Sequence, residues 1–211
     1  GAIRGPIGLV SQSGASAFGP FLARAADLGI GYSYIVSTGN EADLDASDFI
    51  RYLLDDEDTR VIACFIEGLK DGRKFLEVAR MAADRAKPIL VIKTGRSSVG
   101  ARAAMTPTAA MTGSDRVHDA AFSQYGVIRV DDYDELLETA QLMAYSKPTK
   151  KEGMALVSHS GGIASLSADK CGQMGLELPP LTMKAQAELE QVLKGFGGVG
   201  NPADVTGNAN S

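Results

Sequence analysis

The amino-acid sequence predicts an α/β protein with a doubly wound parallel sheet, and two observations support this. Short apolar runs alternate with helical patterns through the first 145 residues. One run, Val61-Ile62-Ala63-Cys64-Phe65-Ile66, is apolar at every position, as expected for a strand covered on both faces. Because crossovers between parallel strands are right-handed, five such strand–helix units favour the flavodoxin-like strand order 2-1-3-4-5.

The individual elements of a first domain at residues 1–145 follow from this alternation. Strands are expected at residues 7–10, 34–37, 61–67, 88–93 and 126–130. Helices are expected at residues 15–28, 46–54, 73–85, 114–124 and 132–144. Asp45 and Ser114 are predicted N-caps, because their side chains can accept a hydrogen bond from the first helical turn.

A second α/β unit is expected after a polar linker. Residues 146–152 are polar and include Pro148, which is typical of a linker. Beyond it, strands are expected at residues 154–157 and 176–178, and helices at 163–174 and 183–193. Because about 60 residues bury too little surface for a comfortable separate α/β domain, residues 153–211 are interpreted as the first part of a second flavodoxin-like domain.

Composition argues against several classes of function. The net charge of −5 disfavours nucleic acid or an anionic membrane as the main partner. The two cysteines and two histidines show no zinc-ligand spacing, so no metal site is predicted. No signal peptide or membrane-spanning apolar stretch is found, which favours a cytoplasmic protein. The chain begins without Met and ends in a loop-like segment, so we expect a piece of a longer protein.

A repeated Ser/Gly turn is the main candidate for chemistry. Ser11-Gln12-Ser13-Gly14-Ala15 is echoed 147 positions later by Ser158-His159-Ser160-Gly161-Gly162, and each copy follows an apolar run and opens a helical pattern. Free N–H groups and the positive end of the helix dipole converge at such a turn. We therefore predict phosphate-binding residues Ser13, Gly14, Ala15, Ser160, Gly161 and Gly162, with one anion handled between two similar units.

Other features at the expected carboxyl edge of the sheet leave alternatives open. Glu67 ends an apolar strand and is either a site carboxylate or a solvated strand-end acid. The stretch 94–113 is longer than ordinary connections and indicates a functional or mobile loop. Ser13 and Ser160 also resemble a hydrolase nucleophile turn. No histidine follows Ser160, however, and only His118 and His159 follow Ser13.

Four stretches of the first domain stand out together, at residues 5–14, 38–43, 65–71 and 93–97. In this order and spacing they resemble the NDP-forming (ADP-forming) acyl-CoA synthetases, relatives of the succinyl-CoA synthetase α subunit. Residues 153–207, ending Gly200-Asn201-Pro202-Ala203-Asp204-Val205-Thr206-Gly207, resemble the start of the next flavodoxin-like domain in fused family members.

This resemblance implies an acid–thiol ligase that converts a carboxylic acid, CoA and ATP into acyl-CoA, ADP and phosphate. CoA and ATP/ADP with Mg²⁺ would be bound mostly by CoA-binding and ATP-grasp domains in the same or a partner chain. It further implies that two helix N-termini hold the phosphate, and that Glu67 contacts a phosphorylated histidine carried on a swinging loop.

The chain departs from the family pattern at that histidine. Pro107 stands at its position, within Thr106-Pro107-Thr108-Ala109, and proline has no nucleophile that could carry a phosphoryl group. The alternatives are therefore a ligase with an altered phosphoryl relay, an inactive CoA- or nucleotide-responsive module of the same fold, and, remotely, a serine hydrolase. We expect the isolated fragment to be inactive. A homo-oligomer is compatible with the sequence.

Overall fold

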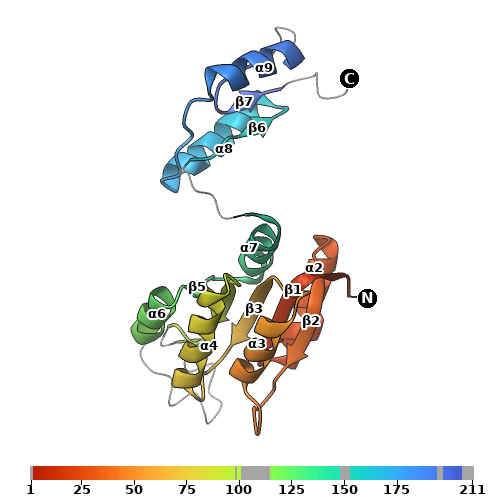
Figure 1. The fold of residues 1–211 in the computed structure, drawn as a ribbon, viewed down its shortest axis with the longest axis vertical. Coiled ribbons are helices and arrows are strands. Elements are labelled where there is room, and N and C mark those ends of the chain that lie inside the picture. Colours follow the sequence, from red (N-terminus) through yellow and green to blue (C-terminus); the bar gives the residue numbers. More distant parts are fainter. Residues whose placement is uncertain (1, 98, 101–114, 148–152, 194–196, 206–211) are drawn as a thin grey trace. The chain divides into compact units, whose positions relative to one another are not determined.

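The computed structural model describes residues 2–97, 99–100, 115–147, 153–193 and 197–205. The chain divides into two compact units, Gly1–Lys147 and Pro148–Ser211 (Figure 1).

The first unit is built on a five-stranded parallel sheet with the order β2-β1-β3-β4-β5. Its strands are β1 (Arg4–Ser11), β2 (Tyr32–Ser37), β3 (Val61–Ile66), β4 (Ile89–Lys93) and β5 (Ile128–Arg129). This confirms the predicted order 2-1-3-4-5. The fifth strand is shorter than expected, and Glu67 lies just beyond β3 instead of inside it.

Helices cover both faces of this sheet, and the central strand β3 contributes side chains to the hydrophobic core on each face. Val61, Ala63 and Phe65 belong to one buried cluster, while the residues between them belong to the other. The first cluster includes side chains of α2 (Leu22–Asp27) and α7 (Tyr133–Tyr145), and the second includes side chains of α3 (Ala46–Asp55), α4 (Gly72–Asp84) and α6 (Asp115–Gln124). The unbroken apolar run at 61–66 therefore reflects two-sided burial.

The first helical segment is continuous but not uniformly α-helical. It comprises α1 (Gly14–Ser16), the π-helical segment η1 (Ala17–Phe21) and α2. Pro20 lies inside η1 and has no N–H to donate to the preceding turn, so the regular hydrogen-bond ladder is interrupted there. Asp45 is the N-cap of α3, as predicted, and forms a capping box with Asp48.

The second unit contains a two-stranded parallel sheet and two helices. Strand β6 (Val157–Ser158) pairs with β7 (Ala203–Asp204), and the helices are α8 (Gly161–Gln173) and α9 (Met183–Leu193). The strand predicted at 176–178 is wrong: Leu176 N–H donates back to the Cys171 carbonyl oxygen of α8, and the bond from Met154 N–H to the Glu177 carbonyl oxygen does not extend into a ladder. Pro179 and Pro180 follow at once and have no N–H groups to extend a ladder.

Candidate functional site

The first Ser/Gly turn lies between β1 and α1. Ser13 is the N-cap of the helix: its backbone is extended, and its Oγ accepts a hydrogen bond from Ser16 N–H at 3.2 Å. The Ser11 hydroxyl donates to the Ser13 carbonyl oxygen at 2.8 Å. Because the first N–H groups of a helix lack an intrahelical acceptor, those of Gly14 and Ala15 are suited to bind an anion.

The second turn repeats this geometry at the start of α8. Ser160 is the N-cap, and its Oγ accepts from Ile163 N–H at 3.5 Å. The Ser158 hydroxyl donates to the Ser160 carbonyl oxygen at 3.0 Å. The N–H groups of Gly161 and Gly162 thus occupy the positions that Gly14 and Ala15 occupy in the first unit. The sequence repeat corresponds to a repeat of hydrogen bonds.

The two turns differ in the side chain that faces the first glycine. A Cβ atom added to Gly14 would lie 3.2 Å from the Ser37 hydroxyl oxygen, at the end of β2. A Cβ atom added to Gly161 would lie 2.8 Å from Asp204 Oδ2, in β7. A neutral hydroxyl therefore lies against the first glycine of one turn and a carboxylate against that of the other, and the Asp204 carboxylate repels an anion at the second turn.

Glu67 lies beside the first turn because Gln12 links the two. The side-chain oxygen of Gln12 accepts from Glu67 N–H at 2.5 Å and from Gly68 N–H at 3.0 Å. Its amide nitrogen donates to the Gly68 carbonyl oxygen at 2.7 Å. The Glu67 carboxylate is partly buried and makes no hydrogen bond or ion pair within the described ranges. It is therefore free to accept a hydrogen bond from a ligand.

A buried lysine bonds to the Glu67 segment from the strand on the opposite side of β3. Lys93, at the end of β4, donates from Nζ to the carbonyl oxygens of Glu67 and Thr94, both at 2.7 Å. Burial and, secondarily, the positive charge of Arg129 lower the pKa of the Lys93 ammonium group. Arg129 itself bonds to Asp115 at 2.6 Å and also to Asp119. Sequence reasoning identified neither Gln12 nor Lys93 as contacts of Glu67.

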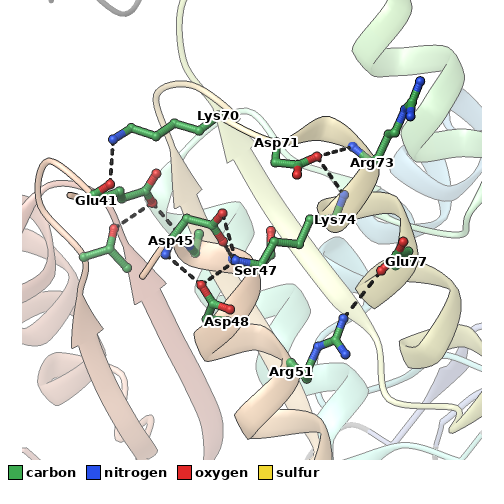
Figure 2. A network of polar contacts seen from close by, with 12 residues as sticks. Glu41, Asp45, Ser47, Asp48, Arg51, Lys70, Asp71, Arg73, Lys74 and Glu77 are labelled. Carbon is green, nitrogen blue, oxygen red and sulfur yellow. Dashed lines mark hydrogen bonds and ion pairs between the residues drawn. The ribbon is translucent and has the colours of Figure 1, made fainter. Parts of the chain in front are cut away.

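The polar residues that follow β2 and β3 form a separate network, shown in Figure 2. Lys70 donates to the Glu41 carbonyl oxygen at 2.6 Å, and Glu41 Oε1 accepts from Ala46 N–H at the start of α3. Lys74 bonds to Asp48 at 2.5 Å, which lowers the pKa of the Asp48 carboxyl group. These acids cap α3 and tie it to α4, so the network is structural.

The remaining expectations concern histidine, metal, membrane and loop. Among the described residues, neither the Ser13 nor the Ser160 hydroxyl bonds to a histidine, which gives no support to a hydrolase site. No cluster of three metal-ligating side chains occurs in the part of the chain that is described. None of the described helices has the length and apolar character that a membrane span requires. Pro107 lies outside the described residues.

Comparison with known proteins places these features in a family. Residues 4–143 match the family described as the succinyl-CoA ligase like flavodoxin domain. An ADP-forming acetate–CoA ligase from Methanocaldococcus jannaschii is 36% identical over 206 residues, covering 98% of this chain and 29% of the relative. The α subunit of ADP-forming acetate–CoA ligase II from Pyrococcus furiosus is 38% identical over 209 residues, covering 99% of this chain and 45% of that subunit.

A solved structure agrees with these relatives. It is the dinucleotide forming acetyl-coenzyme A synthetase 1 of Ca. Korarchaeum cryptofilum, in complex with phosphate and ADP. It superimposes with a TM-score of 0.83 at 30% identity, over 98% of this chain and 45% of that chain. The chain therefore belongs to the succinyl-CoA ligase like flavodoxin domain family, and it spans less than half the length of these relatives.

Proposed function

We propose that this chain is a segment of an ADP-forming acyl-CoA synthetase, which converts a carboxylic acid, CoA and ATP into acyl-CoA, ADP and phosphate. Within that enzyme the chain binds the transferred phosphate at the Ser13–Ala15 turn and presents the Glu67 carboxylate beside it. The observation that carries the proposal is the Gln12 side chain, which joins the helix-capping turn to the Glu67 turn through three hydrogen bonds.

The chemistry of the turn suits phosphate without a cationic side chain. Backbone N–H groups donate to phosphate oxygens, and the positive end of the helix dipole adds to the attraction. The neighbouring ammonium group of Lys93 is directed to two carbonyl oxygens. By the same reasoning Ser160, Gly161 and Gly162 form a second, weaker phosphate site, because the Asp204 carboxylate lies against Gly161.

The phosphoryl relay is the part of the family reaction that this sequence changes. With proline at position 107, no phosphohistidine can form there. Domains outside this chain would hold CoA, the nucleotide and Mg²⁺, as the relatives' names imply for CoA and ADP. In such a protein the phosphoryl group would pass directly between acyl phosphate and nucleotide or use another carrier, for which His159 on the second turn is the candidate, or the ligase reaction would be lost.

Two experiments test the proposal. First, inorganic phosphate is titrated into the ¹⁵N-labelled 211-residue chain, and the amide signals of Gly14 and Ala15 should shift in a saturable way. Second, the longer protein that contains this chain is incubated with γ-labelled ATP, with and without the substitution Pro107→His. Acid-labile label only in Pro107→His would support an intact scaffold that lacks its carrier. Failure of the Gly14 and Ala15 signals to respond at millimolar phosphate would refute the phosphate site.

A surface groove favours the alternative of a nucleotide-responsive binding module. The groove, of about 620 Å³, lies outside the Ser/Gly turns and is lined by Arg51, Arg73, Leu76, Glu77, Arg80, Met81 and Tyr125. Arg51 is paired with Glu77 at 3.6 Å. The guanidinium groups of Arg73 and Arg80, beside the Tyr125 ring, are the groups that can bind the phosphates and the base of a nucleotide. ADP that shifts signals of Arg73 and Tyr125, but not of Gly14, would support this alternative.

A further inference from the structure

The Glu67–Gly68 segment is held by side chains to an unusual degree. The four backbone polar groups of these two residues are two N–H groups and two carbonyl oxygens. Gln12 bonds to both N–H groups and to the Gly68 carbonyl oxygen, and Lys93 bonds to the Glu67 carbonyl oxygen. A segment outside regular secondary structure thus has every main-chain polar group bonded by a side chain from a neighbouring strand or turn.

The bonds come from both neighbours of β3 in the sheet. Gln12 follows β1, which pairs with β3 on one side, and Lys93 ends β4, which pairs with it on the other. Gln12 N–H also donates to the Phe65 carbonyl oxygen at 3.0 Å, which continues the β1–β3 ladder up to the turn. The position of Glu67 is therefore determined by two strands that the sheet itself keeps in register.

The braced backbone contrasts with the unengaged carboxylate that it carries. Ordering a backbone segment costs conformational entropy, and burying the Lys93 ammonium group costs solvation. The Glu67 carboxylate nevertheless makes no hydrogen bond or ion pair of its own in the described part of the chain. A rigid backbone beneath a side chain that makes no hydrogen bond of its own is the arrangement that a working site requires, because the residue is already in place before its ligand arrives.

We propose that Gln12 and Lys93 are positioning residues that fix the Glu67 backbone, and so the point from which its carboxylate side chain extends, beside the Ser13–Ala15 turn. The inference rests on the proposed function for the role of Glu67, but the positioning itself is independent of it. Neither residue needs to touch the substrate. Gln12 places Glu67 relative to the phosphate-binding turn, and Lys93 keeps the Glu67 peptide from rotating away.

The chain supplies a matched control for Lys93. Lys87 also donates from Nζ only to backbone carbonyl oxygens, those of Leu53, Leu54 and Asp56, at 2.8–3.0 Å. Lys87 precedes β4 and so lies at the amino ends of the strands, whereas Lys93 lies at the carboxyl end of β4. Lys93→Met and Lys87→Met therefore remove the same kind of interaction, one beneath Glu67 and one far from it.

The test measures Glu67 directly by NMR in the full 211-residue chain. We expect Lys93→Met and Gln12→Leu to move the Glu67 side-chain carboxyl signal and to speed amide hydrogen exchange at Glu67 and Gly68 by about tenfold or more. Lys87→Met should leave both readouts at wild-type values, even if its free energy of unfolding falls as much as that of Lys93→Met. Unchanged Glu67 signals in Lys93→Met and Gln12→Leu, or equal changes in Lys87→Met, would overturn the proposal.

A double-mutant cycle adds a functional readout. Glu67→Gln removes a negative charge near the bound phosphate, so it should change the phosphate Kd at Gly14 in the wild type and in Lys87→Met. The change should shrink at least threefold in Lys93→Met, where Glu67 is no longer held in place. An undiminished change in Lys93→Met would count against positioning. If the wild type binds no phosphate at Gly14, the proposed function fails, and the exchange and carboxyl signals alone decide the positioning.

Discussion

The unlike surroundings of Gly14 and Gly161 make a sharp prediction about anion binding. Asp204→Asn replaces the carboxylate that lies against Gly161 by an amide of the same shape. The backbone bonds of Asp204 with Gly198, both at 2.9 Å, do not involve the side chain and should survive. We expect phosphate to bind more tightly at the second turn in this variant, with little effect on the first.

The magnitude follows from Coulomb's law. Two unit charges about 4 Å apart repel by about 1 kcal/mol in bulk water and by about 4 kcal/mol at an effective dielectric constant of about 20. The Asp204 carboxylate is only partly buried, so the lower part of this range applies, about 1–2 kcal/mol. Since about 1.4 kcal/mol corresponds to a tenfold change in Kd, we expect phosphate to bind about tenfold more tightly at Gly161.

The assay follows the amide signals of Gly14 and Gly161 during phosphate titration at constant ionic strength. Ser37→Asp is the reciprocal control, because it places a carboxylate against Gly14 and should weaken phosphate binding there by a similar factor. Our reasoning would be refuted by an Asp204→Asn variant whose Gly161 site keeps its wild-type Kd. Equal tightening at both turns would also refute it, since only the second turn faces Asp204.

Three further predictions concern stability. Phe21→Ala should destabilise the first unit by about 3–5 kcal/mol in urea unfolding, because the ring is fully buried against Phe65 and Tyr133; a loss below about 1 kcal/mol would contradict this. Burial, then the charges of Lys93 and Arg129, lower the pKa of His118. The folded protein therefore keeps His118 neutral where the unfolded chain is protonated, so its contribution to stability is complete above pH about 6.5 and is lost as the pH falls. His118→Gln should accordingly lose less stability than wild type between pH 7 and pH 5.5, measured by urea unfolding at each pH, and equal losses would exclude the effect. Gly31→Ala should lower the free energy of unfolding by about 1–3 kcal/mol, since its Cβ atom would lie 2.5 Å from the Arg4 carbonyl oxygen. A Cβ atom at Gly19 would meet no described atom within 4 Å, so Gly19→Ala should not destabilise the protein. Similar melting temperatures for the two variants would disprove the close approach at Gly31.

The sequence by itself determined the fold of the first unit and the location of both Ser/Gly turns. Two-sided burial leaves an unbroken apolar run such as 61–66, and helix capping requires a short polar side chain at a position such as Asp45 or Ser13. Both signals depend on neighbouring residues in the chain, so they can be recognised without knowing the tertiary structure. The prediction of a strand at 176–178 was wrong for a related reason. Apolar residues are present there, but the two prolines that follow have no N–H groups and limit the ladder of hydrogen bonds between strands.

Only the tertiary structure decided which side chains surround the candidate site. Gln12 reaches Glu67 across 55 positions of sequence, Lys93 reaches it across 26, and Asp204 lies against Gly161. Such contacts depend on which backbone group a polar side chain at the end of a strand meets in space, and hydrophobic periodicity, which reports only buried faces, does not encode this. A glutamine or a lysine at the end of an apolar strand reads the same in sequence whether it faces solvent or braces a backbone. Register and strand order, acting over long sequence separations, convert these ordinary polar residues into the support of Glu67.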